Sequence, residues 1–231
     1  MTAGKFITVE GGEGAGKSTQ AKRLQDWLAQ RGIRSLLTRE PGGTVEAEEI
    51  RRLLIDGPNE RWDPLTETLL HFAARRIHID RAILPALAAG KWVICDRFAD
   101  STMAYQGYGL GIEPDVIAQI YEIVIGDIEP DLTIIFDLPI EAAFTRLTER
   151  GETLDRYERR DREFHQRVRD GFHQVAADAP SRCCLLDASG DQDHVAQIVE
   201  SIMTDRLGAA ISAATSEAGT SEVAAEAPNG A

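Results

Sequence analysis

The feature of the sequence that most restricts its fold is the segment GGEGAGKST at residues 11–19, which directly follows the apolar run FITVE. The spacing G-x-x-x-x-G-K-[ST] of a phosphate-binding loop (P-loop) is met by Gly11, Gly16, Lys17 and Ser18. In such a loop the glycines let backbone N–H groups turn inward around phosphates, and the following helix adds the positive end of its dipole. The segment therefore predicts a strand, a phosphate-binding turn and a helix, in that order.

The nine residues of this loop are the expected ATP-binding residues. They are Gly11, Gly12, Glu13, Gly14, Ala15, Gly16, Lys17, Ser18 and Thr19. We expect Lys17 to contact the β- and γ-phosphates and the Ser18 hydroxyl to ligate Mg²⁺. The loop by itself indicates that a nucleoside triphosphate binds, and it leaves open which reaction follows.

Short apolar segments recur along the chain and predict the strands of a sheet. They lie at 5–9, 33–38, 91–95, 132–136 and 183–186. Most show little alternation of polar and apolar residues, which is typical of parallel strands covered on both faces. Helical patterns separate them, at 17–30, 45–55, 64–89, 114–126, 139–149, 161–179 and 191–207. This order predicts an α/β fold with a doubly wound, five-stranded parallel sheet flanked by helices.

The last stretch of the chain differs in composition from the rest. Residues 208–231 are rich in Ala, Ser, Thr, Gly and Glu and contain no aromatic or basic residue. Such a segment buries too little apolar surface to offset the entropy lost on ordering. We therefore expect one folded domain over residues 1–207 and a disordered tail over residues 208–231.

The overall charge and the cysteine pattern narrow the choice of partners. A formal net charge of −13 argues against a broadly basic face for nucleic acid. No signal peptide or apolar run of membrane-spanning length is visible, so no membrane partner is expected. Cys95, Cys183 and Cys184 lie in apolar runs without metal-ligand spacing, which indicates buried thiols in a reducing compartment. The expected location is the cytoplasm.

A second motif, WVICDRF at residues 92–98, places Asp96 and Arg97 at the end of an apolar strand. Ligands of doubly wound sheets bind at the carboxyl ends of the strands. Asp96 can hold magnesium there, directly or through water, and Arg97 can grip a second phosphate with two hydrogen bonds. The sequence contains no N-K-x-D string, which a GTPase switch would need to read guanine.

Five segments taken together resemble the thymidylate (dTMP) kinases of bacteria, a family of P-loop nucleoside monophosphate kinases. They are EGGEGAGKST (10–19), TREPGGT (38–44), FAARR (72–76), DRFADSTMAYQG (96–107) and RGETLDRYERRDREF (150–164). The resemblance runs from about Phe6 to about Leu207. It implies phosphoryl transfer from ATP, with Mg²⁺, to dTMP, which gives ADP and dTDP for dTTP and DNA synthesis. It also implies a short arginine-rich lid at about 146–162 and a homodimer formed through the long helices.

The resemblance also implies the acceptor site. The implied dTMP-binding residues are Arg39, Phe72, Arg76, Arg97, Thr102, Tyr105 and Gln106. Arg39 and Arg97 would hold the monophosphate. Thr102 and Gln106 would read the edge of the base, and Tyr105 would crowd a 2′-hydroxyl.

Within this implied site, Phe72 would stack on the thymine ring and Arg76 would donate to its carbonyl edge. The two residues are spaced i, i+4 and share one face of a helix. A register shifted by one residue would give these roles to His71 and Arg75. The Phe-x-x-x-Arg spacing favours 72 and 76.

Catalysis is assigned by the resemblance to the loop, the second motif and the lid. The implied catalytic residues are Lys17, Arg97, Glu13, Arg150 and Arg156. Glu13 matches an acidic residue beside the sugar and phosphate of the acceptor. Residues 12–15 include no basic side chain, so the chain resembles the members that supply a catalytic arginine from the lid. Arg150 and Arg156 are the first candidates, and Arg146 is next.

Two other functions stay open from the sequence. Another P-loop kinase, acting on a different nucleotide or on a deoxynucleoside, would share the donor site and differ in the base-reading residues. A P-loop ATPase regulated by partner proteins would hydrolyse ATP without an acceptor.

Overall fold

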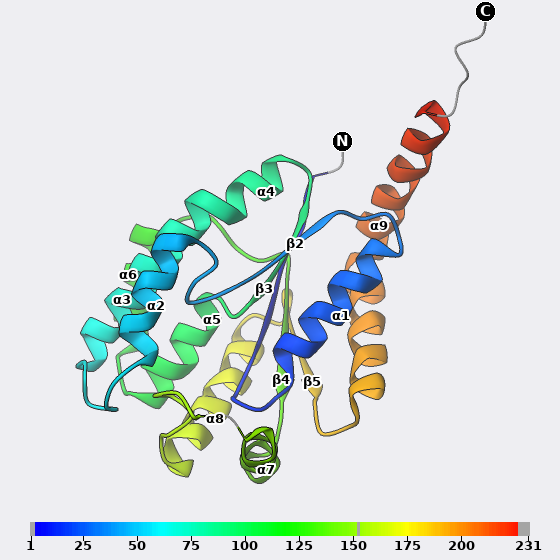
Figure 1. Ribbon diagram of the computed structural model, residues 1–231. Coiled ribbons are helices and arrows are strands. Elements are labelled where there is room, and N and C mark those ends of the chain that lie inside the picture. Colours follow the sequence, from blue (N-terminus) through cyan, green and yellow to red (C-terminus); the bar gives the residue numbers. More distant parts are fainter. Residues whose placement is uncertain (1–2, 152, 226–231) are drawn as a thin grey trace, which may run out of the picture.

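The computed structural model describes residues 3–151 and 153–225, and these residues form one α/β domain around a five-stranded sheet (Figure 1). All strand pairs are parallel, in the order β2-β3-β1-β4-β5. The strands are β1 (Phe6–Gly11), β2 (Ser35–Arg39), β3 (Trp92–Asp96), β4 (Leu132–Asp137) and β5 (Cys183–Asp187). The predicted fold class is confirmed, because the short apolar segments form the strands within two residues at each end.

Helices connect the strands and cover both faces of the sheet. They are α1 (Lys17–Ala29), α2 (Val45–Ile55), α3 (Pro64–His78), α4 (Leu84–Ala88), α5 (Ala99–Thr102), α6 (Pro114–Val124), α7 (Ile140–Arg150), α8 (Arg162–Asp178) and α9 (Gln192–Ala225). Two π-helical segments, η1 (Ile79–Ile83) and η2 (Met103–Gly109), follow α3 and α5. Helices α1 and α9 lie on one side of the sheet, whereas α3, α6 and α8 lie on the other (Figure 1).

The segment predicted as one helix at 64–89 has a local change of helical pitch. It begins as predicted, because the Asp63 carboxylate accepts from the backbone N–H groups of Leu65 and Thr66, and Pro64 occupies the first helical position. Proline at position 85 cannot donate to the preceding turn and its ring crowds that turn. The wider turn of η1, in which Leu84 N–H donates to the Ile79 carbonyl, lies directly before it.

The expectation of disorder from residue 208 is wrong for most of this stretch. Helix α9 continues to Ala225, and Ala210, Ile211 and Ala214 pack against the core cluster that α1 shares with the sheet. These three residues continue the apolar stripe of α9, and alanine has the highest helix propensity. The composition argument missed them because it averaged over the whole stretch. Residues 226–231 lie outside the described part of the chain.

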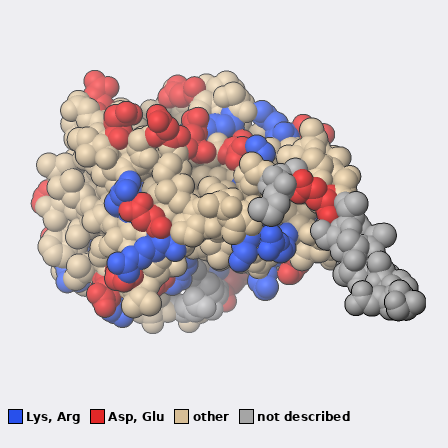
Figure 2. Space-filling view, turned by 90° about the horizontal axis from the view of Figure 1, so that it is seen from above, with Lys and Arg blue, Asp and Glu red and all other residues tan. Residues whose placement is uncertain are grey.

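None of the described helices is both long and apolar enough to cross a membrane. On the face of the molecule seen in Figure 2, acidic and basic side chains are interspersed, with several acidic groups close together along one edge.

Candidate active site

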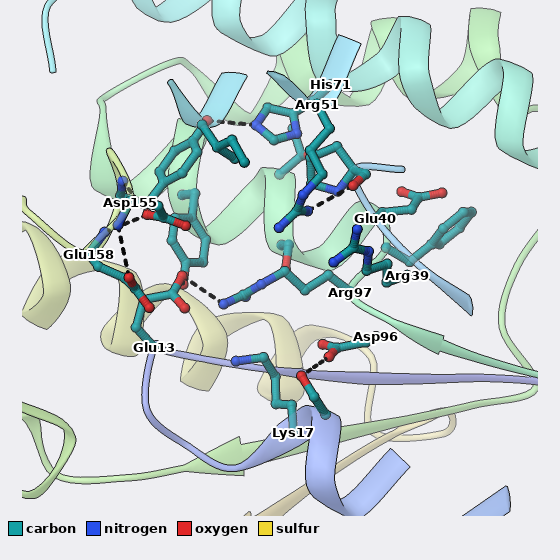
Figure 3. A pocket seen from close by; sticks show the side chains of 18 of the residues that line it. Glu13, Lys17, Arg39, Glu40, Arg51, His71, Asp96, Arg97, Asp155 and Glu158 are labelled. Atoms are coloured by element: carbon teal, nitrogen blue, oxygen red, sulfur yellow. Dashed lines mark hydrogen bonds and ion pairs between the residues drawn. The ribbon is translucent and has the colours of Figure 1, made fainter. Parts of the chain in front are cut away.

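The carboxyl ends of β1, β2 and β3 open into a cavity of about 490 Å³. Its walls come from the P-loop, the β2–α2 connection, α3, the β3–α5 turn, η2 and the segment after α7. Arg39, Arg51 and Arg97 converge in it, and the acidic side chains of Glu13 and Asp155 lie across from them (Figure 3). This cavity can therefore hold a ligand that carries both a phosphate group and hydrogen-bonding groups.

A second cavity, of about 640 Å³, lies on the other side of the P-loop. It is lined by residues 13–20, by Arg146 of α7 and by the connection between β5 and α9. Arg146 donates to the carbonyl groups of Ala188, Ser189 and Gly190, so it ties α7 to that connection. Glu13, Lys17 and Ser18 line both cavities. The two cavities thus meet at the P-loop.

The P-loop turns as its glycines predict. Gly11, Gly14 and Gly16 have φ angles of 134°, 70° and 84°, which favour glycine. A Cβ atom on Gly11 would lie 2.4 Å from the Phe136 carbonyl oxygen, so the neighbouring strand also demands glycine there. Lys17 Nζ donates to the Gly12 carbonyl at 2.6 Å and is held at the mouth of the loop. Burial, followed by the positive charge of Arg97, lowers the pKa of Lys17 to about 8.

The two expected metal ligands lie side by side. Ser18 Oγ donates to Asp96 Oδ2 at 2.5 Å, at the point where both cavities meet. A hydroxyl and a carboxylate are hard oxygen ligands of the kind that Mg²⁺ prefers. This pair therefore fits magnesium.

Arg97 and Glu13 form the centre of the charged network. Arg97 Nη2 donates to Glu13 Oε1 at 2.8 Å, and the Tyr105 hydroxyl donates to the same oxygen at 2.8 Å. Burial opposes ionisation of Glu13, but Arg97, Lys17 and Tyr105 together outweigh it and lower the pKa of Glu13 to about 2. Burial likewise opposes the charge of Arg97, and Glu13 outweighs it, so the pKa of Arg97 is raised. Both groups are ionised at neutral pH.

Arg97 is also conformationally unusual. Among the described non-glycine residues it is the one with positive φ, at 72°. Its Nη1 donates to the Gly11 carbonyl at 2.8 Å and to Ser101 Oγ at 3.2 Å. These bonds, with that to Glu13, hold the strained backbone in place and aim the guanidinium into the first cavity, called the acceptor cavity below because most residues expected to bind the acceptor line it.

The assignment of Phe72 and Arg76 to the base site is wrong in this structure. The Phe72 side chain is buried in the core cluster under α3, and Arg76 lies on the outer surface, where it donates to the Val124 carbonyl. His71 and Arg75, the residues of the alternative register, line the cavity instead. The large apolar ring goes to the core because adjacent positions on a helix face directions about 100° apart, and only one of them can face the sheet.

Arg75 is a buried cation that makes three hydrogen bonds within the protein. It donates through Nε to Glu40 at 2.6 Å, through Nη1 to Thr102 Oγ1 at 3.0 Å and through Nη2 to the Phe98 carbonyl at 2.9 Å. Glu40 accepts on its other oxygen from His78 Nδ1 at 2.8 Å. Although Glu40, His78 and Cys95 lie close enough to hold a metal ion, both carboxylate oxygens of Glu40 are already hydrogen-bonded. This cluster therefore positions Arg75.

Arg156, expected to be a catalytic arginine of the lid, lines neither of these cavities. Its side chain is wholly buried, forms an ion pair with Glu67 and donates to the carbonyls of Leu54 and Asn59. Arg146 lines the second cavity, on the other side of the P-loop, instead. The structure places Arg150 at the end of α7, and its side chain lies outside the described part.

Several cavity residues were not identified from the sequence. Arg51 of α2 lines the cavity and donates to the Pro41 carbonyl at 2.8 Å. Asp155 and Tyr157 close the cavity from the segment after α7, and the Tyr157 hydroxyl shares a hydrogen bond of 2.8 Å with His71 Nε2. Burial, followed by the charge of Arg75, holds the pKa of His71 well below 6.5, so the imidazole is neutral. The sequence predicted the helix that carries Arg51, at 45–55, but not which way this side chain points.

The expected acceptor residues Arg39, Arg97, Thr102, Tyr105 and Gln106 all line the acceptor cavity. A parallel sheet with a P-loop after β1, and two cavities joined at that loop, define a P-loop nucleotide kinase.

Comparison with known proteins identifies the family. The family model described as thymidylate kinase matches residues 9–199. The chain is 47% identical over 214 residues to a thymidylate kinase of Bradyrhizobium sp. (strain ORS 278), covering 92% of this chain and 95% of the relative. It is 49% identical over 208 residues to that of Caulobacter vibrioides, covering 90% and 100%. A crystal structure of thymidylate kinase from Ehrlichia chaffeensis matches with a TM-score of 0.71 at 38% identity, covering 87% and 99%. The chain belongs to the thymidylate kinase family, and its reaction is the phosphorylation of dTMP to dTDP.

Proposed function

We propose that the chain transfers the γ-phosphoryl group of ATP to dTMP with Mg²⁺ at the P-loop. The observation that carries this proposal is that Glu13, Lys17 and Ser18 line both cavities. ATP in the larger cavity and dTMP in the smaller one would bring donor and acceptor phosphates together at Lys17. Phosphoryl transfer depends mainly on such alignment and on charge neutralisation.

Ser18 and Asp96 are the proposed holders of magnesium. When bound, the ion would supply positive charge to the donor phosphate oxygens. Lys17 adds a further positive charge at the same point. No general base is required, because the acceptor is already a phosphate oxyanion.

The acceptor would lie with its phosphate among Arg39, Arg51 and Arg97. Its base would lie toward Arg75 and Gln106, since these residues line the part of the cavity formed by α3 and η2. The Tyr105 ring packs 4.9 Å from the Arg97 guanidinium, between the phosphate and base ends, where a 2′-hydroxyl would meet it. Among the lid residues, Arg146 and Arg150 stay candidates for contact with the transferring group.

The experiment that tests the proposal is an assay of dTDP formation from dTMP and ATP with and without Mg²⁺. We expect no turnover in excess EDTA. The variants Ser18→Ala and Asp96→Asn should each need about 10-fold or more Mg²⁺ for half-maximal rate. Turnover that is unchanged in EDTA would overturn the metal assignment, and equal turnover of dTMP and UMP would overturn the assignment of Tyr105.

We also infer that the chain forms a homodimer through α3 and α6. Leu65 and Leu69 of α3 are 43% and 50% exposed, and Ile123 of the neighbouring α6 is 83% exposed. Exposed apolar side chains on adjacent helices are typical of an interface. Light scattering should give the mass of two chains for the wild type and of one chain for the variant Leu69→Glu/Ile123→Glu. A wild-type mass of one chain would contradict the inference.

The proposed place of action is the cytoplasm. The support is that Cys95, Cys183 and Cys184 are free thiols, as in proteins of reducing compartments.

A further inference from the structure

A buried carboxylate on α3 connects a base-site residue to the lid. Glu67 has no exposed surface, and its two oxygens bond side chains that come from distant parts of the sequence. Its Oε1 accepts from Gln106 Nε2 at 2.8 Å, and its Oε2 is ion-paired with Arg156. Glu67 does not line the acceptor cavity, whereas Gln106 does.

The chemistry of Glu67 fixes the orientation of the Gln106 amide. A carboxylate that is paired with a guanidinium has only accepting oxygens. The amide must therefore turn its NH₂ group toward Glu67, which leaves Gln106 Oε1 for the cavity. No hydrogen bond from the described residues reaches this oxygen. The cavity wall is thus supplied with a free acceptor.

Arg75 supplies the complementary donor. Its guanidinium has five N–H groups, of which three are used by Glu40, Thr102 and Phe98, and it lines the same wall. A wall with one acceptor and one donor matches thymine, which offers N3–H beside a carbonyl oxygen. Cytosine offers the reverse, an accepting N3 beside an NH₂ group. It would face the wall with two mismatched pairs.

We propose that Glu67 is a specificity-determining positioning residue, which selects thymine over cytosine by holding the Gln106 amide in one orientation. The inference rests on the proposed function, in which Gln106 faces the base. Glu67 acts without touching the substrate. The second oxygen of Glu67 is paired with Arg156, which can only donate, so both carboxylate oxygens face donors.

The test is the variant Glu67→Gln, assayed with dTMP and dCMP. Arg156 can only donate, so the carbonyl of the new side chain must face Arg156 and its NH₂ group must face residue 106. Gln106 must then turn its own carbonyl inward and present NH₂ to the cavity. Each base then meets one mismatched hydrogen bond, so dTMP gains a mismatch and dCMP loses one. We expect the ratio of kcat/KM for dTMP to that for dCMP to fall by about 100-fold or more.

Two further variants separate this role from a purely structural one. Arg156→Lys weakens the same ion pair but leaves the Glu67 carboxylate in place. The ratio of kcat/KM for dTMP to that for dCMP should therefore stay within about threefold of wild type. The double variant Glu67→Gln with Gln106→Glu exchanges the two groups. The amide then at position 67 can accept from Arg156 and donate to the carboxylate at position 106, whose second oxygen faces the base, so the preference for dTMP should return.

The outcomes decide between the alternatives. The inference would be overturned if Glu67→Gln lowered the rate equally with dTMP and dCMP. It would also be overturned if Arg156→Lys lowered the dTMP-to-dCMP ratio of kcat/KM as much as Glu67→Gln does. The variant Gln106→Leu tests the underlying assignment: an unchanged ratio there means that Gln106 does not read the base, and the proposed placement of the base fails while phosphoryl transfer to dTMP remains. If a variant does not fold, neutron diffraction of the wild-type complex with dTMP tests the orientation of the Gln106 amide directly. We expect the amide deuterons to point to Glu67, and deuterons that point to the base would refute the proposal.

Discussion

At the residue scale, the charge of Lys17 should control the binding of ATP at alkaline pH. Its pKa of about 8 means that the free enzyme loses this positive charge as the pH rises through 8. We expect kcat/KM for ATP to fall above about pH 8, because a neutral amine no longer attracts the donor phosphates. Under saturating ATP the decline in kcat should move to higher pH, since bound phosphates favour the charged form. A kcat/KM profile that is flat to pH 9.5 would contradict this expectation.

The two neighbouring arginines of α3 should behave very differently. Arg75 is buried and bonded to Glu40, whereas Arg76 is half-exposed and pairs with Asp80. We expect Arg75→Lys to lower kcat/KM for dTMP by about 100-fold, because one ammonium cannot replace three directed hydrogen bonds and a contact with the base. The matched variant Arg76→Lys should stay within about twofold. Steady-state kinetics with dTMP as the varied substrate measure both variants. A larger loss of kcat/KM in Arg76→Lys would show that Phe72 and Arg76, and not His71 and Arg75, contact the base.

Individual site residues could be predicted where a sequence motif fixes their position in the fold. The P-loop glycines, Lys17, Asp96 and Arg97 follow from strand ends and loop geometry, so their positions in the structure agree with the sequence. The register of α3 could not be read in this way. His71 with Arg75 and Phe72 with Arg76 have the same i, i+4 spacing, and the choice depends on which ring fills the core beside Ile79 and Val93.

At the scale of elements, the segment after α7 is anchored to the α2–α3 connection. Arg156, Arg159 and Arg160 donate to the carbonyl groups of Leu54, Gly57 and Asn59. The clustering of arginines suggested phosphate binding, but it could not show that three of them hold this segment against the α2–α3 connection. Strands and amphipathic helices were easier to predict, because their patterns depend on burial alone.

This anchoring makes Arg156 a determinant of stability. Replacing it by Met would leave the buried carboxylate of Glu67 without its cation, and we expect the free energy of unfolding to fall by about 3–5 kcal/mol. The exposed Arg159 is a matched control, and Arg159→Met should cost no more than about 1 kcal/mol. Urea unfolding measures both. Unchanged stability of Arg156→Met with kcat lowered about 10³-fold would instead identify Arg156 as the arginine that contacts the transferring phosphoryl group.

At the scale of the whole molecule, the two cavities lie at the carboxyl ends of the strands. Helix α9 begins beside the second cavity and extends away from it along the face of the sheet that also carries α1 (Figure 1). Helix α9 packs on α1, which begins in the P-loop, so the far part of α9 stabilises the layer that carries the loop without contacting either ligand. Its contribution to stability and its contribution to catalysis should therefore be separable.

Shortening α9 separates them. A chain that ends at Gly208 loses Ala210, Ile211 and Ala214, and we expect its free energy of unfolding to be lower by about 1–2 kcal/mol, from the apolar surface of Ile211 and the two alanines. The values of kcat and KM below the unfolding transition should not change, because none of these residues lines a cavity. A chain that ends at Glu217 keeps all three and should match the full chain in both respects. Equal stability of all three chains would show that the outer turns of α9 add nothing to the core, and a lower kcat in the shortest chain would show that α9 supports the P-loop as well as the fold.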